Sequence, residues 1–253
     1  MSNHKDLQKL SAGGFLISLG IIYGDIGTSP LYVFKAIVGQ RQISETLILG
    51  GVSLIFWTLT LQTTLKYVVI TLRADNKGEG GIFSLFSLVR RKAKWLIIPA
   101  VVGGCALLAD GIITPPITIS SAIEGLQTYY PNLPTVYVVM AIITALFIIQ
   151  QFGTSLVGKA FGPIMFVWFT MMGFLGVTYI VHDPWVIRSL NPYYAIKLLT
   201  SSSSDGAFII LGAVFLCTTG AEALYSDLGH CGKANIRVSW VYVKICLILT
   251  NLG

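Results

Sequence analysis

Long apolar runs are the feature that most restricts what this chain can fold into. Stretches of about 20 predominantly apolar residues, the length that crosses a bilayer as a helix, recur between polar connections. Of the 253 residues, 54% are hydrophobic and 11% are charged, whereas a soluble domain has about 25% charged residues. The runs lack the alternation over segments of about ten residues that barrel strands show. The sequence therefore predicts an all-α, polytopic membrane protein with the lipid bilayer as its surroundings.

Seven spans are predicted on this length scale. Their approximate limits are 16–38, 46–70, 95–126, 136–152, 161–181, 207–228 and 238–253. The third is longer than one straight span. We expect it to kink after Thr114, because Pro115 and Pro116 remove two amide donors and clash with the preceding turn.

The basic residues predict how the spans are oriented. Three Lys and Arg residues fall on one side of the spans, at Arg41, Arg188 and Lys197. Eleven fall on the other side: Lys5, Lys9, Arg73, Lys77, Arg90, Arg91, Lys92, Lys94, Lys159, Lys233 and Arg237. The positive-inside rule then predicts a multi-pass plasma-membrane protein with a cytoplasmic N-terminus. The net charge of +6 also fits nucleic acid, but the basic residues flank apolar spans and no nucleic-acid-binding signature is present.

Other chemistries find little support in the sequence. The four cysteines show no paired spacing that would indicate a disulfide framework or a zinc site. Gly78–Gly81, G-E-G-G, lacks the pattern of a phosphate-binding loop, so ATP-driven transport is not indicated. No Ser-His-Asp grouping appears. We therefore expect neither an enzyme nor a cofactor.

The segment G-I-I-Y-G-D-I-G-T-S-P-L-Y, residues 20–32, places a carboxylate inside the first apolar run. Asp25 is surrounded by glycines and followed by Pro30, residues that interrupt a helix. Backbone carbonyls freed in a bilayer core are tolerated where they are buried or line a polar cavity, and they can then bind a cation. We take Asp25 as the centre of a transport site; a purely structural pairing with a neighbouring helix is the alternative.

Two later pairs of polar residues share helix faces. Asp110 and Thr114 are four apart, and Thr219 and Glu222 are three apart. Carboxylates that converge in a low dielectric cannot all stay ionised cheaply, so at least one is expected to take up a proton. Glu124, near the outer end of its span, is either an entrance carboxylate or the partner of an external Lys or of solvent.

An internal similarity indicates an inverted repeat, although chance similarity remains open. Segments 19–25 and 211–217 both begin spans that soon meet a glycine and a carboxylate, and S-P-L-Y and E-A-L-Y follow them, ending at Tyr32 and Tyr225. The two spans are predicted to run in opposite directions. If the repeat is real, its first five-span copy covers about 12–181, and the second begins at about 207–253 and is truncated. A fragment of a longer protein is then expected.

Seven motifs occur in one order along nearly the whole chain. They are G-I-I-Y-G-D-I-G-T-S-P-L-Y (20–32), G-E-G-G (78–81), A-D-G-I-I-T-P (109–115), S-A-I-E-G-L (121–126), Q-Q-F-G-T (150–154), G-K-A-F-G-P (158–163) and G-A-E-A-L-Y-S-D-L-G-H (220–230). In these motifs the chain resembles the N-terminal part of the KUP/HAK/KT family of potassium uptake permeases.

The resemblance implies a potassium importer, in many members coupled to proton entry. It implies the leucine-transporter-like inverted-repeat fold of the amino-acid/polyamine/organocation superfamily, with about a dozen spans and a cytoplasmic C-terminal domain that is absent here. A homodimer formed through that missing part stays open. Potassium and protons are then substrates, not cofactors. By resemblance, the potassium-binding residues are Asp25, Tyr32, Asp110, Thr114, and Thr218 or Thr219, and Glu222 couples protons.

Three other functions stay open. One is an amino-acid or organic-cation permease on the same plan, although a substrate carboxylate disfavours Asp25 at the broken helix. A potassium channel is less well supported, since no T-V-G-Y-G filter is present. The third is a truncated membrane scaffold that does not transport.

Overall fold

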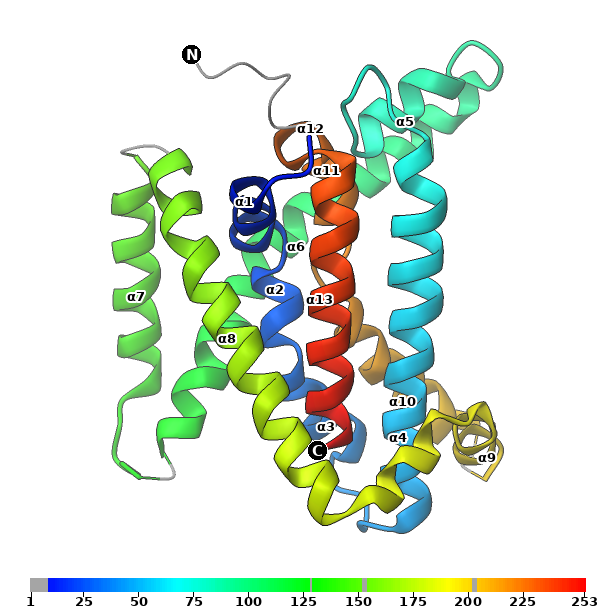
Figure 1. The fold of residues 1–253 in the computed structure, drawn as a ribbon, viewed down its shortest axis with the longest axis vertical. Helices are drawn as coiled ribbons and strands as arrows, with labels where there is room; N and C mark the ends of the chain where they lie inside the picture. The colour runs from blue at the N-terminus through cyan, green and yellow to red at the C-terminus, as the bar shows by residue number, and fades with distance from the viewer. Residues whose placement is uncertain (1–8, 128, 152–153, 202–203) are drawn as a thin grey trace.

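The computed structural model describes residues 9–127, 129–151, 154–201 and 204–253, and these ranges are almost entirely helical, without a strand (Figure 1). Four stretches are long and apolar enough to cross a membrane: Glu45–Arg73, Lys94–Gln127, Ala160–His182 and Gly206–Ser226. The predicted all-α, polytopic membrane protein is therefore confirmed at this level. The other three predicted spans are shorter, broken or more polar.

The predicted first span is not one helix. It consists of α1 (Ala12–Ile22), α2 (Gly24–Thr28) and α3 (Pro30–Val38). Pro30 has no N–H to donate to Ile26, and the N–H of Tyr32 donates to Ser29 O at 3.1 Å instead of to Thr28. The predicted break is present, and the carbonyls of Ile26 and Thr28 lack their regular helical donors.

The second span changes its helical type midway. It begins as α4 (Glu45–Thr58), where the Ser44 side chain accepts from Leu47 N, and continues as a π-helical segment, Leu59–Ile70, and a final turn, Thr71–Arg73. A π-helix has a wider turn than an α-helix. Its side chains therefore point in directions that α-helical spacing does not predict. The amphipathic α5 (Ile82–Val89) follows after a short connection.

The third predicted span is the long helix α6 (Ile97–Gln127), which begins after a short turn, Lys94–Leu96. It continues through both prolines without ending, and the kink after Thr114 stays a prediction. The fourth is α7 (Thr135–Gln150), which is shorter than expected; its predicted end at 152 and part of the Q-Q-F-G-T motif lie outside the described residues.

The fifth predicted span lies within α8 (Thr154–His182). A turn, Pro184–Leu190, and α9 (Pro192–Ser201) lead to the sixth, which is also broken. It consists of α10 (Ser204–Phe215), a turn Leu216–Thr218, α11 (Ala223–Ser226) and α12 (Leu228–Cys231). The span predicted over 207–228 is thus present but interrupted, and the helix face predicted to be shared by Thr219 and Glu222 is wrong, because the chain is not helical between Thr218 and Ala223. Gly220 has a φ of 82°, which does not fit an α-helix and is easily adopted only by glycine. The seventh is α13 (Lys233–Leu252).

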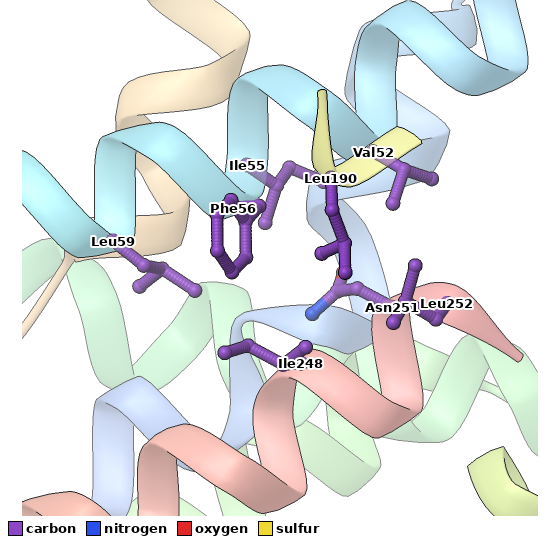
Figure 2. Close-up of a pocket in the computed structure, with 8 residues that line it drawn as sticks. All are labelled: Val52, Ile55, Phe56, Leu59, Leu190, Ile248, Asn251 and Leu252. Carbon is purple, nitrogen blue, oxygen red and sulfur yellow. The ribbon is translucent and has the colours of Figure 1, made fainter. Parts of the chain in front are cut away.

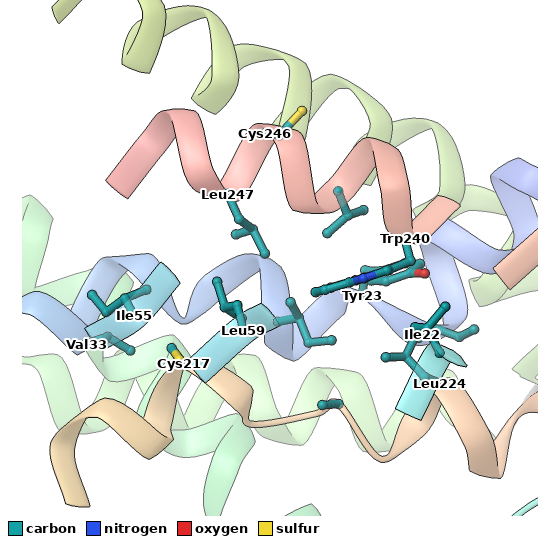
Figure 3. Close-up of a cluster of buried hydrophobic side chains, with 14 of the residues drawn as sticks. Ile22, Tyr23, Val33, Ile55, Leu59, Cys217, Leu224, Trp240, Cys246 and Leu247 are labelled. Atoms are coloured by element: carbon teal, nitrogen blue, oxygen red, sulfur yellow. The ribbon is translucent and has the colours of Figure 1, made fainter. Parts of the chain in front are cut away.

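Aromatic side chains of α8 and α13 pack around Tyr23 and hold the first break in place; Figure 3 shows Tyr23 and Trp240 lying against each other. Tyr23, at the junction of α1 and α2, stacks on Trp240 with ring centroids 6.3 Å apart. The rings of Tyr23 and Phe169 form an edge-to-face contact. The Tyr23 hydroxyl lies 3.0 Å from Ser239 Oγ, within hydrogen-bonding distance. Trp168 Nε1 donates to Gly27 O at 3.0 Å. The short helix α2 is thus fixed from the α8 and α13 side.

The ends of the helices separate the predicted loops into two groups. Figure 1 shows α5, α11 and α12 at one end of the molecule, together with the beginnings of α1 and α13, and α9 and the end of α3 at the other. Most of the eleven basic residues on the predicted cytoplasmic side belong to the first end; Lys5 lies outside the described residues. The arrangement agrees with the predicted topology, and the side of the membrane stays a prediction.

Candidate functional site

The two broken segments meet at Asp25 and Gly220. A Cβ atom added to Gly220 would lie 2.7 Å from the Cβ of Asp25 and 3.4 Å from the backbone nitrogen of Ile26. No larger residue fits without a shift of one segment. The breaks in the first and sixth predicted spans therefore face each other directly.

Helix α6 brings a second carboxylate to this meeting point. The hydroxyl of Thr114, which is buried, donates to Asp110 Oδ1 at 2.8 Å. The predicted shared face of these two residues is thus present. The carboxylates of Asp110 and Asp25 are close enough to interact electrostatically, and both side chains are half-buried.

Glu222 supplies the third carboxylate, from the segment between α10 and α11. It interacts electrostatically with Asp110 and Asp25. Asp110, Thr219, Gly220 and Glu222 line one open pocket of about 230 Å³. The other lining residues come from α5 and α6: Ile82, Gly103, Ala106 and Leu107. Asp25 packs against Gly220 and is not among the residues that line this pocket.

Of the two threonine alternatives, Thr219 faces the site. The hydroxyl of Tyr32 interacts with the Thr219 side chain and lies 3.4 Å from Ser29 Oγ. The Thr218 hydroxyl instead donates to Phe215 O at 2.8 Å, within its own turn. The structure therefore brings together Tyr32 and Thr219, whereas the one hydrogen bond given for the Thr218 hydroxyl is local.

Some of the carbonyls expected to be free are satisfied by nearby side chains. Asp25 O accepts from Thr28 Oγ1 and Ser29 Oγ, both at 3.0 Å, as well as from Ser29 N at 3.2 Å. Gly27 O accepts from Trp168, as described above. The carbonyls of Ile26 and Thr28 are the better candidates for an ion.

Sequence reasoning missed Tyr67, which interacts electrostatically with Glu222. Tyr67 belongs to the π-helical segment, where α-helical periodicity does not apply, so no sequence signal pointed to it. In the same segment the buried hydroxyl of Thr63 has no hydrogen-bond partner in the described part of the chain.

Two further observations limit the site. Lys35 Nζ lies 2.9 Å from Glu124 Oε2 at an exposed position, so of the two interpretations of Glu124 the structure favours the partner of an external lysine. No group of three or more His, Cys, Asp or Glu residues within the described ranges is suited to hold a metal ion.

A separate cavity between α4 and α13 carries no acidic residue. It measures about 10 Å³, and Figure 2 shows the side chains around it. Asn251 is its only polar lining side chain among the described residues; the others are Val52, Ile55, Phe56, Leu59, Leu190, Ile248 and Leu252. It is not a candidate for a cation site.

Comparison with known proteins identifies the family. Residues 12–253 match the family described as the K+ potassium transporter integral membrane domain. The probable potassium transport system protein Kup of Flavobacterium psychrophilum is 64% identical over 254 residues, covering 100% of this chain and 38% of that protein. The protein of the same name from Enterococcus faecalis is 60% identical over 260 residues, covering 98% of this chain and 39% of that protein.

The chain thus spans about two fifths of the length of these curated relatives. No solved structure matches it. The relatives are transport proteins and not enzymes, in agreement with the membrane-spanning helices and the motifs of the sequence. The chain belongs to the family of K+ potassium transporter integral membrane domains.

Proposed function

We propose that this chain takes part in potassium uptake across the plasma membrane, driven by the entry of protons. One observation carries the proposal: Asp25 and Glu222, on the two broken segments, and Asp110, on α6, come within electrostatic reach of one another. Three carboxylates gathered inside a set of membrane-spanning helices are costly unless they serve an ion. The relatives are named as probable potassium transport system proteins, which supports potassium as the transported ion.

Potassium would bind on the Asp25 side of Gly220. A dehydrated potassium ion needs several oxygens in place of its water shell. Asp25 offers a carboxylate, Tyr32 and Thr219 offer hydroxyls, and the carbonyls of Ile26 and Thr28 lack regular helical donors. Asp110, held by Thr114, would add a second negative charge at the edge of the site.

Glu222 would couple the proton. Its carboxyl group and that of Asp110 can share one proton, which removes the repulsion between two neighbouring anions. The three carboxylates can bind both cations at once: a proton shared by Asp110 and Glu222, and a potassium ion beside Asp25, each compensating a different negative charge. Because a symporter must carry both cations together, this joint binding is what the coupling requires.

The test uses a chimera in which these 253 residues replace the matching part of the Flavobacterium psychrophilum relative. Rubidium uptake is measured in potassium-starved cells that lack their own potassium importers, with and without a proton ionophore. We expect uptake that the ionophore abolishes. Glu222→Gln should lower the uptake rate at least tenfold or remove its pH dependence, while Glu45→Gln, the same change at the exposed start of α4, should do neither.

Two outcomes would contradict the proposal. Uptake of an amino acid instead of rubidium would favour the permease alternative. If Glu222→Gln changes neither rate nor pH dependence, Glu222 does not couple protons. The chain by itself, purified into liposomes, is expected to show no potassium flux.

We also propose a cytoplasmic N-terminus and an inverted repeat over about 12–181 and 207–253. The two facing breaks, with a glycine on one segment and a carboxylate on the other, support the repeat. A reporter fused at Lys92 should be active only in the cytoplasm. A reporter at Lys92 that is active outside the cell would overturn the orientation.

A further inference from the structure

The connection after the second span forms a small hairpin, residues 74–81. Asn76 N donates to Glu79 O at 2.9 Å, and Glu79 N donates to Asn76 O at 3.1 Å. Lys77 and Gly78, between them, have φ values of 57° and 88°, which fits a tight type I′ turn. Asp75 Oδ2 accepts from Gly78 N at 3.1 Å. The hairpin is therefore a defined structure despite its polar sequence.

Two polar contacts dock this hairpin onto the sixth and seventh predicted spans. The hydroxyl of Tyr225 donates to Ala74 O at 2.6 Å. Lys233 Nζ, at the start of α13, donates to Asp75 Oδ1 at 3.2 Å, and each side chain of this ion pair is 35% exposed. The hairpin thus bridges the first part of the chain to the segment that follows Glu222.

Glycines make the docking close. A Cβ atom at Gly80 would collide with the carbonyl of Tyr225, and one at Gly229 would collide with the carboxylate of Glu79. G-E-G-G and the end of the 220–230 motif, which the ion site does not explain, therefore fit against each other. Their glycines are needed for this contact and not for binding phosphate.

Both sides of this contact lie close in the chain to residues of the proposed ion site. Tyr225 follows Glu222 by three residues. On the other side, Ile82 follows the hairpin directly and lines the pocket that contains Asp110 and Glu222. Ile82 packs against Gly103 of α6, where a Cβ would meet its Cδ1 at 3.3 Å. When the hairpin moves, this wall of the pocket moves with it.

The ion pair of this contact is accessible to solvent. An open cavity of about 210 Å³ reaches the ion pair and is lined by Asp75, Gly78, Leu228, Gly232 and Lys233. Water can therefore solvate both charges when they separate, so separation costs little. A purely structural contact of this size would be more stable if it were apolar and closed.

We propose that the 74–81 hairpin is a gate at the basic end of the molecule, held shut by the Asp75–Lys233 ion pair and the Tyr225–Ala74 hydrogen bond. Opening would connect the Asp110–Glu222 pocket with the side of the membrane on which Lys77 and Lys233 lie. The gating role rests on the proposed function, whereas the opening of the hairpin can be tested without transport.

The first experiment measures opening directly. Ile82→Cys is placed in the chimera with the exposed Cys105 replaced by Ala, and a membrane-impermeant thiol reagent is applied to inside-out vesicles. Asp75→Asn should raise the labelling rate about fivefold, equivalent to about 1 kcal/mol. Asp183→Asn, the same change at the opposite end, should leave the labelling rate unchanged. In the parent without Ile82→Cys, Asp75→Asn should have no effect on labelling. The exchanged pair Asp75→Lys with Lys233→Asp should restore slow labelling.

The second experiment asks whether transport needs the opening. Asp75→Cys and Lys233→Cys are linked by a short bifunctional thiol reagent that a reductant cleaves. Rubidium uptake should stop on linking and return on reduction. In each single cysteine variant, neither the linking reagent nor the reductant should change the uptake rate.

The outcomes separate the two proposals. The proposed gate would be contradicted by a labelling rate that Asp75→Asn does not change, or by full rubidium uptake with the cross-link in place. If labelling responds as expected but no chimera takes up rubidium, the hairpin opens and the proposed function fails.

Discussion

The backbone of Gly220 packs directly against the side chain of Asp25, and the contact leaves no room for a Cβ atom on Gly220. Gly220 also has a φ of 82°. The close approach and the conformation therefore require glycine for two independent reasons. Their coincidence where the two broken segments meet makes Gly220 the most sensitive position of the candidate site.

Gly220→Ala should destabilise the chain by about 2 kcal/mol, because alanine at positive φ costs about 1–2 kcal/mol and the collision with Asp25 adds to it. Rubidium uptake by the chimera should be lost, and thermal unfolding in detergent measures the stability. Gly212→Ala is the matched control, since a Cβ there meets nothing within 4 Å. Equal effects of the two substitutions would show that the contact with Asp25 does not matter.

Thr114→Val should weaken the site without changing its shape. The substitution removes the hydroxyl that donates to Asp110 at 2.8 Å, and a hydrogen bond to a charged group contributes about 1.5–3 kcal/mol. We expect a KM for rubidium that is at least tenfold higher. Thr144→Val removes a comparable hydroxyl from α7, where it bonds only to Met140 O in the exposed part of the helix, and should leave KM unchanged. An unchanged KM for Thr114→Val would remove Asp110 from the ion site.

The sequence predicted the helical membrane fold and the first break, because both follow from local chemistry. Apolar runs must be helical in a bilayer, and Pro30 removes a helical donor wherever it lies. The shared face of Asp110 and Thr114 followed from their spacing in a regular helix. In these cases the residues that decide the structure are neighbours in the chain.

The features that depend on distant contacts could not be predicted in the same way. Gly220 was recognised only as a residue within a span, since neither its positive φ nor its contact with Asp25 can be read from the residues beside it in the chain. Tyr67 was missed because the π-helical segment changes which side chains face Glu222. The docking of Gly80 against Tyr225 joins segments far apart in the sequence, and no local pattern specifies it.

The exposed ion pair of Lys35 and Glu124 should contribute little to stability. The side chains are 78% and 48% exposed, and pairs of this kind are worth about 0–1 kcal/mol. A double-mutant cycle with Lys35→Met and Glu124→Gln, followed by thermal unfolding, should give a coupling within that range that shrinks in high salt. A larger coupling that does not change with salt would mean that the pair is shielded from solvent.

The Asp75–Lys233 ion pair should make the 74–81 hairpin sensitive to acid. The hydrogen bond from Lys233, with a second from Gly78 N, lowers the pKa of Asp75 below its ordinary value of 3.8. A carboxylate with a lowered pKa stabilises the folded contact above its ordinary pKa, and this stabilisation is lost as the pH falls through the lowered value. The hairpin should therefore be fully docked at neutral pH and begin to loosen only below about pH 4.

Amide hydrogen exchange of the hairpin measures this loss. The ratio of the exchange rate in Asp75→Asn to that in the parent cancels the intrinsic pH dependence of exchange. We expect a constant ratio above one at higher pH, which falls towards one as Asp75 of the parent becomes protonated. Asp183→Asn should give a ratio near one throughout, because its change lies outside the hairpin contact. A ratio for Asp75→Asn that stays constant down to the lowest pH would show that the charge of Asp75 does not hold the hairpin, and that the Tyr225 hydrogen bond and the glycine packing suffice.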